Sequence, residues 1–169
     1  MTPEQAQFAL GMLLGAFENE TPVTRKVIAA MPENQTSLKP HEKSMSALDL
    51  AWHIVSSEVW FVQGIANSEF SQEESKRPAE MDSFAKILAW YDRELPAALA
   101  KLKALPPEKL AAELDFFGIV KMPAVAYLGL LNSHSVHHRG QFSVYLRLAG
   151  AKVPSIYGGS ADEPFQAPA

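Results

Sequence analysis

The most informative absence in this sequence is cysteine, which does not occur among its 169 residues. Disulfides, thiolate metal ligands and a cysteine nucleophile are therefore excluded. Any thiol chemistry performed by the protein must use a sulfur atom from another molecule. A chain without disulfides also has the cytoplasm as its default location.

Positive charge and long apolar runs are scarce as well. The net charge is −4 and no block of basic residues occurs, so we expect no nucleic-acid partner. No apolar stretch approaches the length that spans a bilayer, and Met1–Gln5 does not open a secretory signal, so we expect no membrane partner. Hydrophobic residues make up 47% and charged residues 20%, which predicts one globular domain over residues 1–169.

Helical periodicity dominates the chain, and strand-like alternation is not sustained anywhere. Four apolar patterns at helical spacing cover residues 3–31, 46–67, 83–105 and 123–148. Pro22 interrupts the first pattern, and we expect a kink within one helix there rather than a second helix. Ser46 and Asp49 form a capping box at the start of the second, while Gly150 and Pro154 stop the fourth.

Polar connections separate these patterns at residues 32–43, 68–79 and 106–118, the last of which we interpret as a short turn followed by a loop. An irregular tail covers residues 151–169. Four long helices with connections of this length predict an all-α fold, a four-helix bundle with long crossover loops. Bundle interiors are places where facing helices assemble metal sites.

His134 and His138 lie one helical turn apart, so both imidazoles point from the same face of the fourth helix. A zinc site that performs chemistry usually has a third protein ligand. His53, His41 and neighbouring carboxylates are the candidates, and His41 in its polar loop is better explained by solvation. His53 lies among apolar residues of the second helix, where it is either a ligand or a core histidine with one hydrogen bond.

Gln141 and Tyr145 continue the line of His134 and His138 along the fourth helix at helical spacing. His137 falls to one side of this line, in a cleft wall or in solvent. Glu58 lies among apolar residues of the second helix, and a buried carboxylate requires a cation or hydrogen-bond donors. Arg139 is the partner that the sequence suggests. Trp60 either lines a pocket or packs in the core.

These residues together resemble the DinB/YfiT-like superfamily of metalloenzymes. The resemblance rests on His53 followed by Glu58 and Trp60, on the block from His134 to Gln141, and on the tail Val153–Asp162. It implies a four-helix bundle with a divalent-metal site formed by His53, His134 and His138, holding zinc or nickel. It also implies thiol-dependent S-transferase or isomerase chemistry with a low-molecular-weight thiol as cosubstrate, and pairing into a homodimer.

Three functions remain open from the sequence. The first is a metal-dependent transferase that adds a small thiol to a small-molecule electrophile, with Gln141, Tyr145 or His137 orienting or protonating the substrate. The second is a metal-dependent hydrolase with the same three ligands, which requires a glutamate as general base. The third is a non-catalytic helical module that binds a metal or ligand without turnover.

Overall fold

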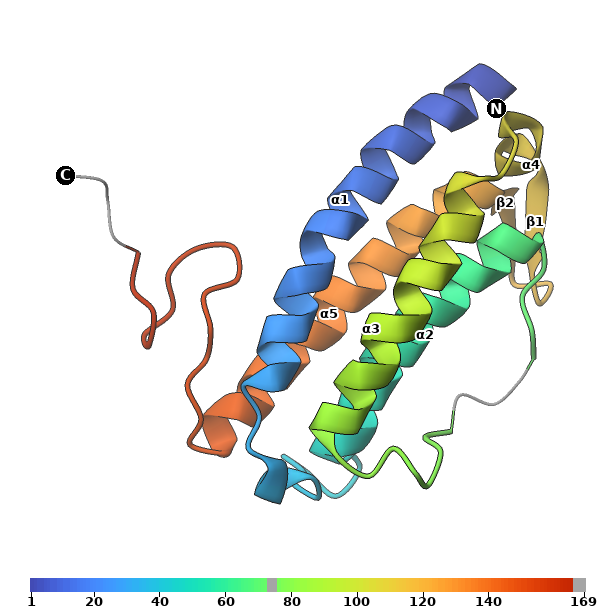
Figure 1. Cartoon of the computed structure of the whole chain (residues 1–169). Helices are drawn as coiled ribbons and strands as arrows, with labels where there is room; N and C mark the ends of the chain where they lie inside the picture. Colours follow the sequence, from blue (N-terminus) through green and yellow to red (C-terminus); the bar gives the residue numbers. More distant parts are fainter. Residues whose placement is uncertain (73–75, 166–169) are drawn as a thin grey trace.

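Four long helices lie side by side in the computed structural model, which describes residues 1–72 and 76–165 (Figure 1). They are α1 (Pro3–Ala29), α2 (Ala47–Asn67), α3 (Phe84–Lys103) and α5 (Tyr127–Leu148). Helix α2 packs on α3 and α5, and α1 packs on α5 and α3. The predicted all-α four-helix bundle is therefore confirmed.

The directions of the helices require one long crossover. Helices α1 and α5 run one way and α2 and α3 run the other, so the connection after α2 returns along the length of the bundle (Figure 1). Residues 73–75 of this predicted loop lie outside the described residues. Helices α2 and α5 are antiparallel neighbours in this bundle, so the part of α2 that carries His53 lies against the part of α5 that carries His134 and His138.

Side-chain caps and prolines define the helix boundaries much as the sequence predicts. Ser46 caps α2, and its hydroxyl accepts a hydrogen bond from the backbone N–H of Asp49 at 3.1 Å. Pro22 lies inside the continuous helix α1, which confirms one helix rather than two. Helix α5 ends before Gly150, whose φ of 68° is the left-handed conformation that glycine adopts at low cost.

A β-hairpin corrects the expected loop between α3 and α5. The short helix α4 (Pro107–Ala111) is followed by the antiparallel strands β1 (Glu113–Phe116) and β2 (Val120–Pro123). The turn between them has positive φ at Phe117 and Gly118. Strands of four residues are too short to show alternation in a sequence, which is why the hairpin was not expected. The Tyr127 hydroxyl stabilises this pair of strands by donating to the Leu114 and Val120 carbonyls at 2.8 and 3.1 Å.

The hairpin carries aromatic side chains onto α2. Phe116 and Phe117 lie beside Trp60, with ring centroids 5.9 and 6.2 Å away. Trp60 also packs on Phe70, and its indole N–H donates to the Ser71 carbonyl at 3.2 Å. Of the two roles that the sequence left open for Trp60, the structure therefore places it in an aromatic cluster that covers one end of the bundle.

The described part of the C-terminal tail, residues 151–165, contains no helix or strand, and residues 166–169 lie outside the described residues. Polar contacts attach it to the bundle. Lys26 of α1 donates to the Ser155 carbonyl at 2.7 Å, and Arg147 of α5 pairs with Asp162 at 2.8 Å. The tail is thus irregular but held at both α1 and α5.

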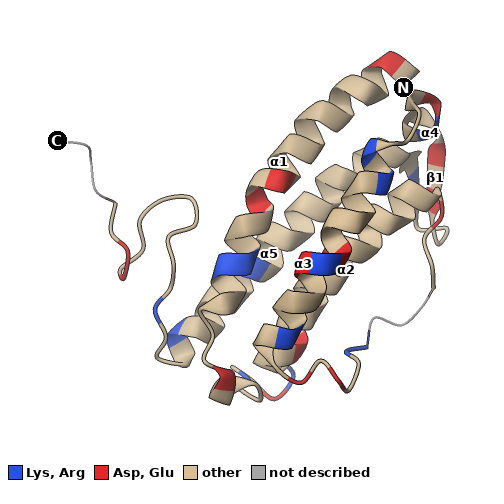
Figure 2. Cartoon of the chain, viewed as in Figure 1, with Lys and Arg blue, Asp and Glu red and all other residues tan. Residues whose placement is uncertain are grey.

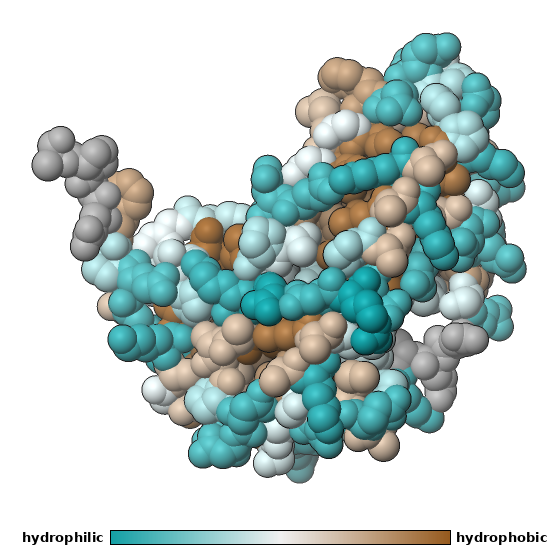
Figure 3. All heavy atoms as spheres, viewed as in Figure 1, coloured by the Kyte–Doolittle hydropathy of each residue, from teal (hydrophilic) through white to brown (hydrophobic). Residues whose placement is uncertain are grey.

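The surface is mixed in charge and largely polar. Basic and acidic segments are interspersed along the visible helices (Figure 2), and hydrophilic residues cover most of the face shown in Figure 3. The apolar sides of the four long helices form the core instead. Among the described residues, no helix is long and apolar enough to cross a bilayer.

Candidate metal centre

Three imidazoles converge between α2 and α5. His53 comes from α2, and His134 and His138 come from consecutive turns of α5. One nitrogen of each ring lies within 4.8 Å of the others, and the Nε2 atoms of His53 and His138 are 3.2 Å apart. The structure therefore brings together the three residues that the sequence analysis named as metal ligands. We call these three residues the histidine site.

The donor set and the spacing fit a divalent transition metal. Two imidazole nitrogens bound to a tetrahedral zinc ion at ~2.0–2.1 Å are about 3.3 Å apart, close to the separation of His53 and His138. The Nδ1 atom of His134 is buried and has no hydrogen-bond partner among the described residues. An unpartnered buried nitrogen is costly in a folded protein, and a bound ion is one way to satisfy such a group.

The surroundings keep these rings neutral, which is the form that binds a metal. Burial lowers the pKa of His134 to about 4, and the charge of the neighbouring histidines acts in the same direction. Burial and His138 lower the pKa of His53. Burial also lowers the pKa of His138, although its hydrogen bond to Gln141 opposes the shift. At neutral pH all three rings therefore offer a nitrogen lone pair.

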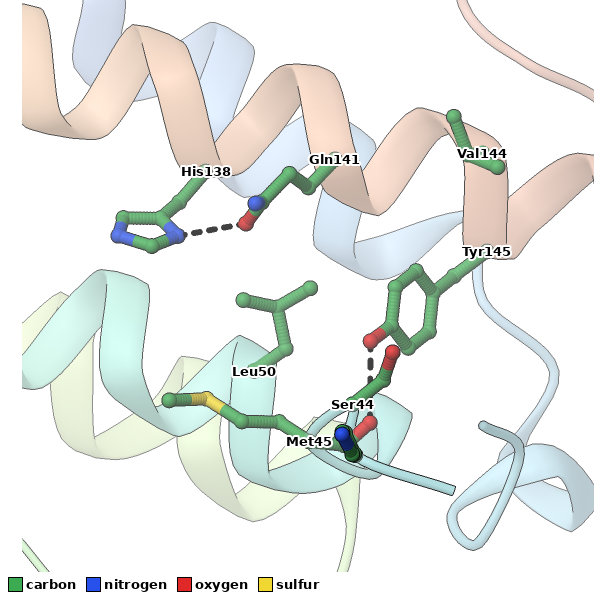
Figure 4. Close-up of a pocket in the computed structure, with 8 residues that line it drawn as sticks. Ser44, Met45, Leu50, His138, Gln141, Val144 and Tyr145 are labelled. Carbon is green, nitrogen blue, oxygen red and sulfur yellow. Dashed lines mark hydrogen bonds between the residues drawn. The ribbon is translucent and has the colours of Figure 1, made fainter. Parts of the chain in front are cut away.

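Gln141 is positioned to select the tautomer of His138. Its Oε1 atom lies 2.7 Å from His138 Nδ1 (Figure 4). A carbonyl oxygen only accepts, so Nδ1 carries the proton and the lone pair is on Nε2, the atom that faces His53. An acceptor behind a histidine ligand orients the ring and raises its basicity.

A pocket of about 470 Å³ opens beside His138, between α5 and the segment that leads into α2. Ligand pockets commonly have volumes of ~300–1,000 Å³. In Figure 4, Gln141, Val144 and Tyr145 extend along α5 on one side, with Leu50 and Met45 opposite. The lining residues are Lys43, Ser44, Met45, Leu50, His138, Gln141, Val144 and Tyr145.

Tyr145 forms the far wall of this pocket, and its hydroxyl donates to the Met45 carbonyl at 3.0 Å (Figure 4). This bond joins α5 to the segment before α2. The sequence analysis did not identify the residues from Lys43 to Met45 as part of the site. The sequence signal that could have identified them is their position just before the capped start of α2. Residues at such a position lie near the first turns of the helix, and His53 lies within the second turn of α2.

The two remaining histidines lie outside the cluster. His137 is exposed, its ring centroid lies 4.8 Å from that of His138, and it is not among the residues that line the pocket. His41 is exposed and accepts a hydrogen bond from the backbone of Lys43 at 3.2 Å. The expected placement of His137 to one side, and of His41 in solvent, agrees with the structure.

The expected ion pair between Glu58 and Arg139 is wrong. Arg139 pairs with the Glu20 carboxylate of α1, and it donates to the Tyr157 hydroxyl at 2.6 Å. The Thr24 hydroxyl lies between the two residues of the predicted pair, accepting from Arg139 at 3.3 Å and donating to Glu58 at 3.4 Å. We call Glu20, Thr24, Glu58, Tyr91, Arg139 and Tyr157 the buried ion network, in which Tyr157 is the exposed member that joins it from the tail.

Desolvation explains the choice of partner. Glu58 is 0% exposed, and this burial raises the pKa of its carboxyl to about 7, although hydrogen bonds from Tyr91 and Thr24 and the charge of Arg139 oppose the shift. The side chain of Glu20 is 17% exposed, so an ion pair formed there loses less hydration than one formed at Glu58. The arginine therefore pairs with the carboxylate that keeps contact with water.

The fold and the site together define the class of this protein. It is a small helical bundle with a candidate metal centre, which three neutral histidines form beside a pocket. A family model described as the DinB family matches residues 6–166. The chain belongs to the DinB family.

Two curated relatives come from Bacillus subtilis. YjoA is 31% identical over 141 residues, which covers 82% of this chain and 89% of YjoA. YrdA is 26% identical over 158 residues, which covers 91% of each chain. These relatives span nearly the whole bundle.

Solved structures show the same fold. The crystal structure of a DinB-like protein from Bacillus cereus aligns with a TM-score of 0.72 at 27% identity, covering 86% of this chain and 95% of the other. That of the DinB-like protein YjoA from B. subtilis aligns with a TM-score of 0.68 at 28% identity, covering 85% and 96%. The fold and family expected from the sequence are thus confirmed.

Proposed function

We propose that the chain is a metal-dependent enzyme that holds a divalent ion, zinc or nickel, through His53, His134 and His138. The observation that carries this proposal is the convergence of three neutral imidazoles from two helices beside an open pocket. Three neutral ligands leave the full charge of the ion in place, and three protein ligands leave one position for a water or substrate.

The reaction that we propose is the transfer of a low-molecular-weight thiol to a small electrophile. Bound at this site, a divalent ion would supply the positive charge that favours the anionic form of a coordinating thiol at neutral pH. The chain contributes no sulfur nucleophile of its own, because it has no cysteine. The sulfur in this reaction would therefore have to come from an imported thiol.

The residues around the site have distinct proposed roles. Gln141 holds the His138 ring in the tautomer that presents Nε2, and so acts as a positioning residue. Tyr145 shapes the far wall of the pocket and orients a substrate there. His137 is exposed beside His138, and the role we propose for it is to orient or protonate a substrate that approaches the histidine site.

The two alternatives have less support. A hydrolase needs a carboxylate that accepts a proton from water at the site, but Glu58 contacts Thr24 and Tyr91 in the interior of the bundle. A non-catalytic module would be favoured by a closed, saturated site, whereas a pocket opens beside His138.

Metal analysis tests the ligand set. Protein purified without a histidine tag or a nickel column is analysed for bound metal, together with His53→Ala and His134→Ala. We expect about one ion per wild-type chain and loss of at least about 90% in both variants, because two remaining ligands bind weakly. His41→Ala is the matched control, since it removes a histidine that lies outside the cluster. Unchanged metal in the first two variants would refute the site.

Turnover tests the reaction. The metal-loaded protein is incubated with a panel of small thiols and chlorodinitrobenzene, and thioether formation is followed. We expect a rate above the uncatalysed reaction that is lost in His134→Ala and kept in His41→Ala. Metal binding without acceleration for any thiol would support the binding module instead.

A further inference from the structure

The pocket beside His138 has an asymmetric set of polar groups. Of its eight lining residues, none is acidic and Lys43 is the basic one. Met45, Leu50 and Val144 supply apolar walls. A pocket that combines one cation with no carboxylate favours a ligand with a negatively charged end and a short apolar body.

Donors predominate among the side-chain polar atoms that remain available in the pocket, although the hydroxyl oxygens of Ser44 and Tyr145 can also accept. The Gln141 carbonyl oxygen is engaged by His138 Nδ1, which leaves the amide N–H groups to donate. The Tyr145 hydroxyl already donates to the Met45 carbonyl, so that carbonyl is also occupied. Lys43 and Ser44 contribute further donors. Carboxylate oxygens accept several hydrogen bonds, so they match this set better than an amine or an alcohol does.

We propose that this pocket binds the carboxylate end of a small thiol whose sulfur lies at the histidine site, with Lys43 and the Gln141 amide contacting the carboxylate. This assignment rests on the proposed function, because it places the other end of the ligand at the metal. It narrows the cosubstrate to anionic mercaptocarboxylates. It also gives a role to the segment before α2, which forms one wall of the pocket and contributes the cation.

The test compares acids with neutral thiols of matched length. Zinc-loaded protein is titrated by calorimetry with mercaptoacetate, 3-mercaptopropionate and 4-mercaptobutyrate, and with the corresponding mercaptoalcohols. We expect one chain length at which the acid binds about fivefold more tightly than the alcohol, a modest factor because Lys43 is exposed. Added salt should reduce this preference.

Lys43→Met should remove the preference, because it should lower the affinity for the mercaptocarboxylate to that for the mercaptoalcohol. The affinity for the mercaptoalcohol should not change. Lys39→Met is the matched control, because Lys39 is an exposed lysine of the same connection that does not line the pocket. Equal binding of acids and alcohols at every length, or a preference that survives Lys43→Met, overturns the assignment.

A measurement without metal separates this inference from the proposed function. If the protein takes up no zinc, the metal site fails, and metal-free protein is titrated with butyrate or 1-butanol while the Gln141 side-chain amide signals are followed by NMR. Shifts with butyrate that are absent with the alcohol and lost in Lys43→Met support the carboxylate pocket by itself. No shift with butyrate overturns it.

Discussion

Helices α2 and α5 carry two polar clusters that differ in how their polar atoms are satisfied. In the buried ion network, charged and hydroxyl groups from four helices and the tail find partners within the protein. In the histidine site, His134 Nδ1 has no partner among the described residues, and a pocket opens beside His138. Protein interiors rarely leave polar groups unpaired, so the network has a structural role and the histidine site is suited to a ligand.

Removing the central cation of the network should produce the largest change in stability. Arg139→Met leaves Glu20 without its charge partner in a mostly buried place, which costs about 3–5 kcal/mol of unfolding free energy. Urea denaturation of metal-free protein measures the loss. Arg93→Met is the control, because Arg93 pairs with Glu94 on the surface and its loss costs less than about 1 kcal/mol. If both variants lost a similar amount of unfolding free energy, Arg139 in the network would be no more important for stability than the surface pair of Arg93 and Glu94.

The protonation of Glu58 should make stability depend on pH. Its folded pKa of about 7 lies above the ordinary value of 4.5, so the folded state holds a proton that the unfolded state releases between these values. The contribution of Glu58 to the unfolding free energy therefore falls by about 3 kcal/mol as pH rises through this window, whereas the lowered pKa of His134 contributes in the opposite direction. Glu58→Gln, which resembles the neutral form, should lack this decline.

Urea denaturation at several pH values, with the wild type compared to Glu58→Gln, measures this contribution. Glu108→Gln serves as the matched control, because Glu108 is exposed on the short helix α4. Parallel stability curves for the wild type and Glu58→Gln would show that the carboxyl is ionised at a normal pKa despite its burial.

Substitution of a residue that supports the histidine site should change zinc affinity rather than the stability of the metal-free protein. Gln141→Leu removes the acceptor of the His138 Nδ1 proton, and we expect zinc affinity about tenfold lower, with the unfolding free energy of metal-free protein nearly unchanged. Competition with a chromophoric chelator measures the affinity. Gln141→Glu retains an acceptor and should restore binding, whereas Gln7→Leu on the exposed side of α1 should have no effect. Wild-type affinity in Gln141→Leu would remove Gln141 from its positioning role.

The smallest effect is expected where the tail meets the network. Tyr157→Phe removes the hydroxyl that donates to Glu20 at 2.9 Å and accepts from Arg139, which costs about 1 kcal/mol. The ring remains beside the Arg139 guanidinium, at 5.4 Å from its centroid. Thermal denaturation detects the loss, and zinc affinity should stay within about twofold. A larger change in zinc affinity than in stability would show that the two clusters are coupled.

Much of the fold was predictable because helix signals are local. Ser46, Pro22 and Gly150 act on their own turns, and the spacing of apolar side chains follows the helical repeat within each segment. The hairpin was missed for the opposite reason. Its two strands have four residues each, and packing of Phe116 and Phe117 against Trp60 joins segments far apart in the chain.

The candidate site was predictable in part for the same reason. His134 and His138 share a face by helix geometry alone, and Gln141 and Tyr145 follow on that line. The partner of Arg139 was not predictable, because Glu20 and Glu58 both offer a carboxylate and their difference in burial exists only in the folded bundle. The pocket residues Lys43 and Met45 depend in the same way on how the segment before α2 lies against α5.

The sequence by itself determined four helices, most of their ends, the pair His134 and His138, and the absence of any sulfur nucleophile in the chain. The expected start of the fourth helix at residue 123 was wrong, because this residue ends β2 and α5 begins at Tyr127. Only the tertiary structure decided that His53 joins this pair, that Arg139 pairs with Glu20, and that a pocket without acidic residues adjoins His138. The physical reason is the distance along the chain over which each interaction acts. Helix formation depends on neighbours within a few residues, whereas burial, charge pairing and ligand convergence depend on which helices the bundle places side by side.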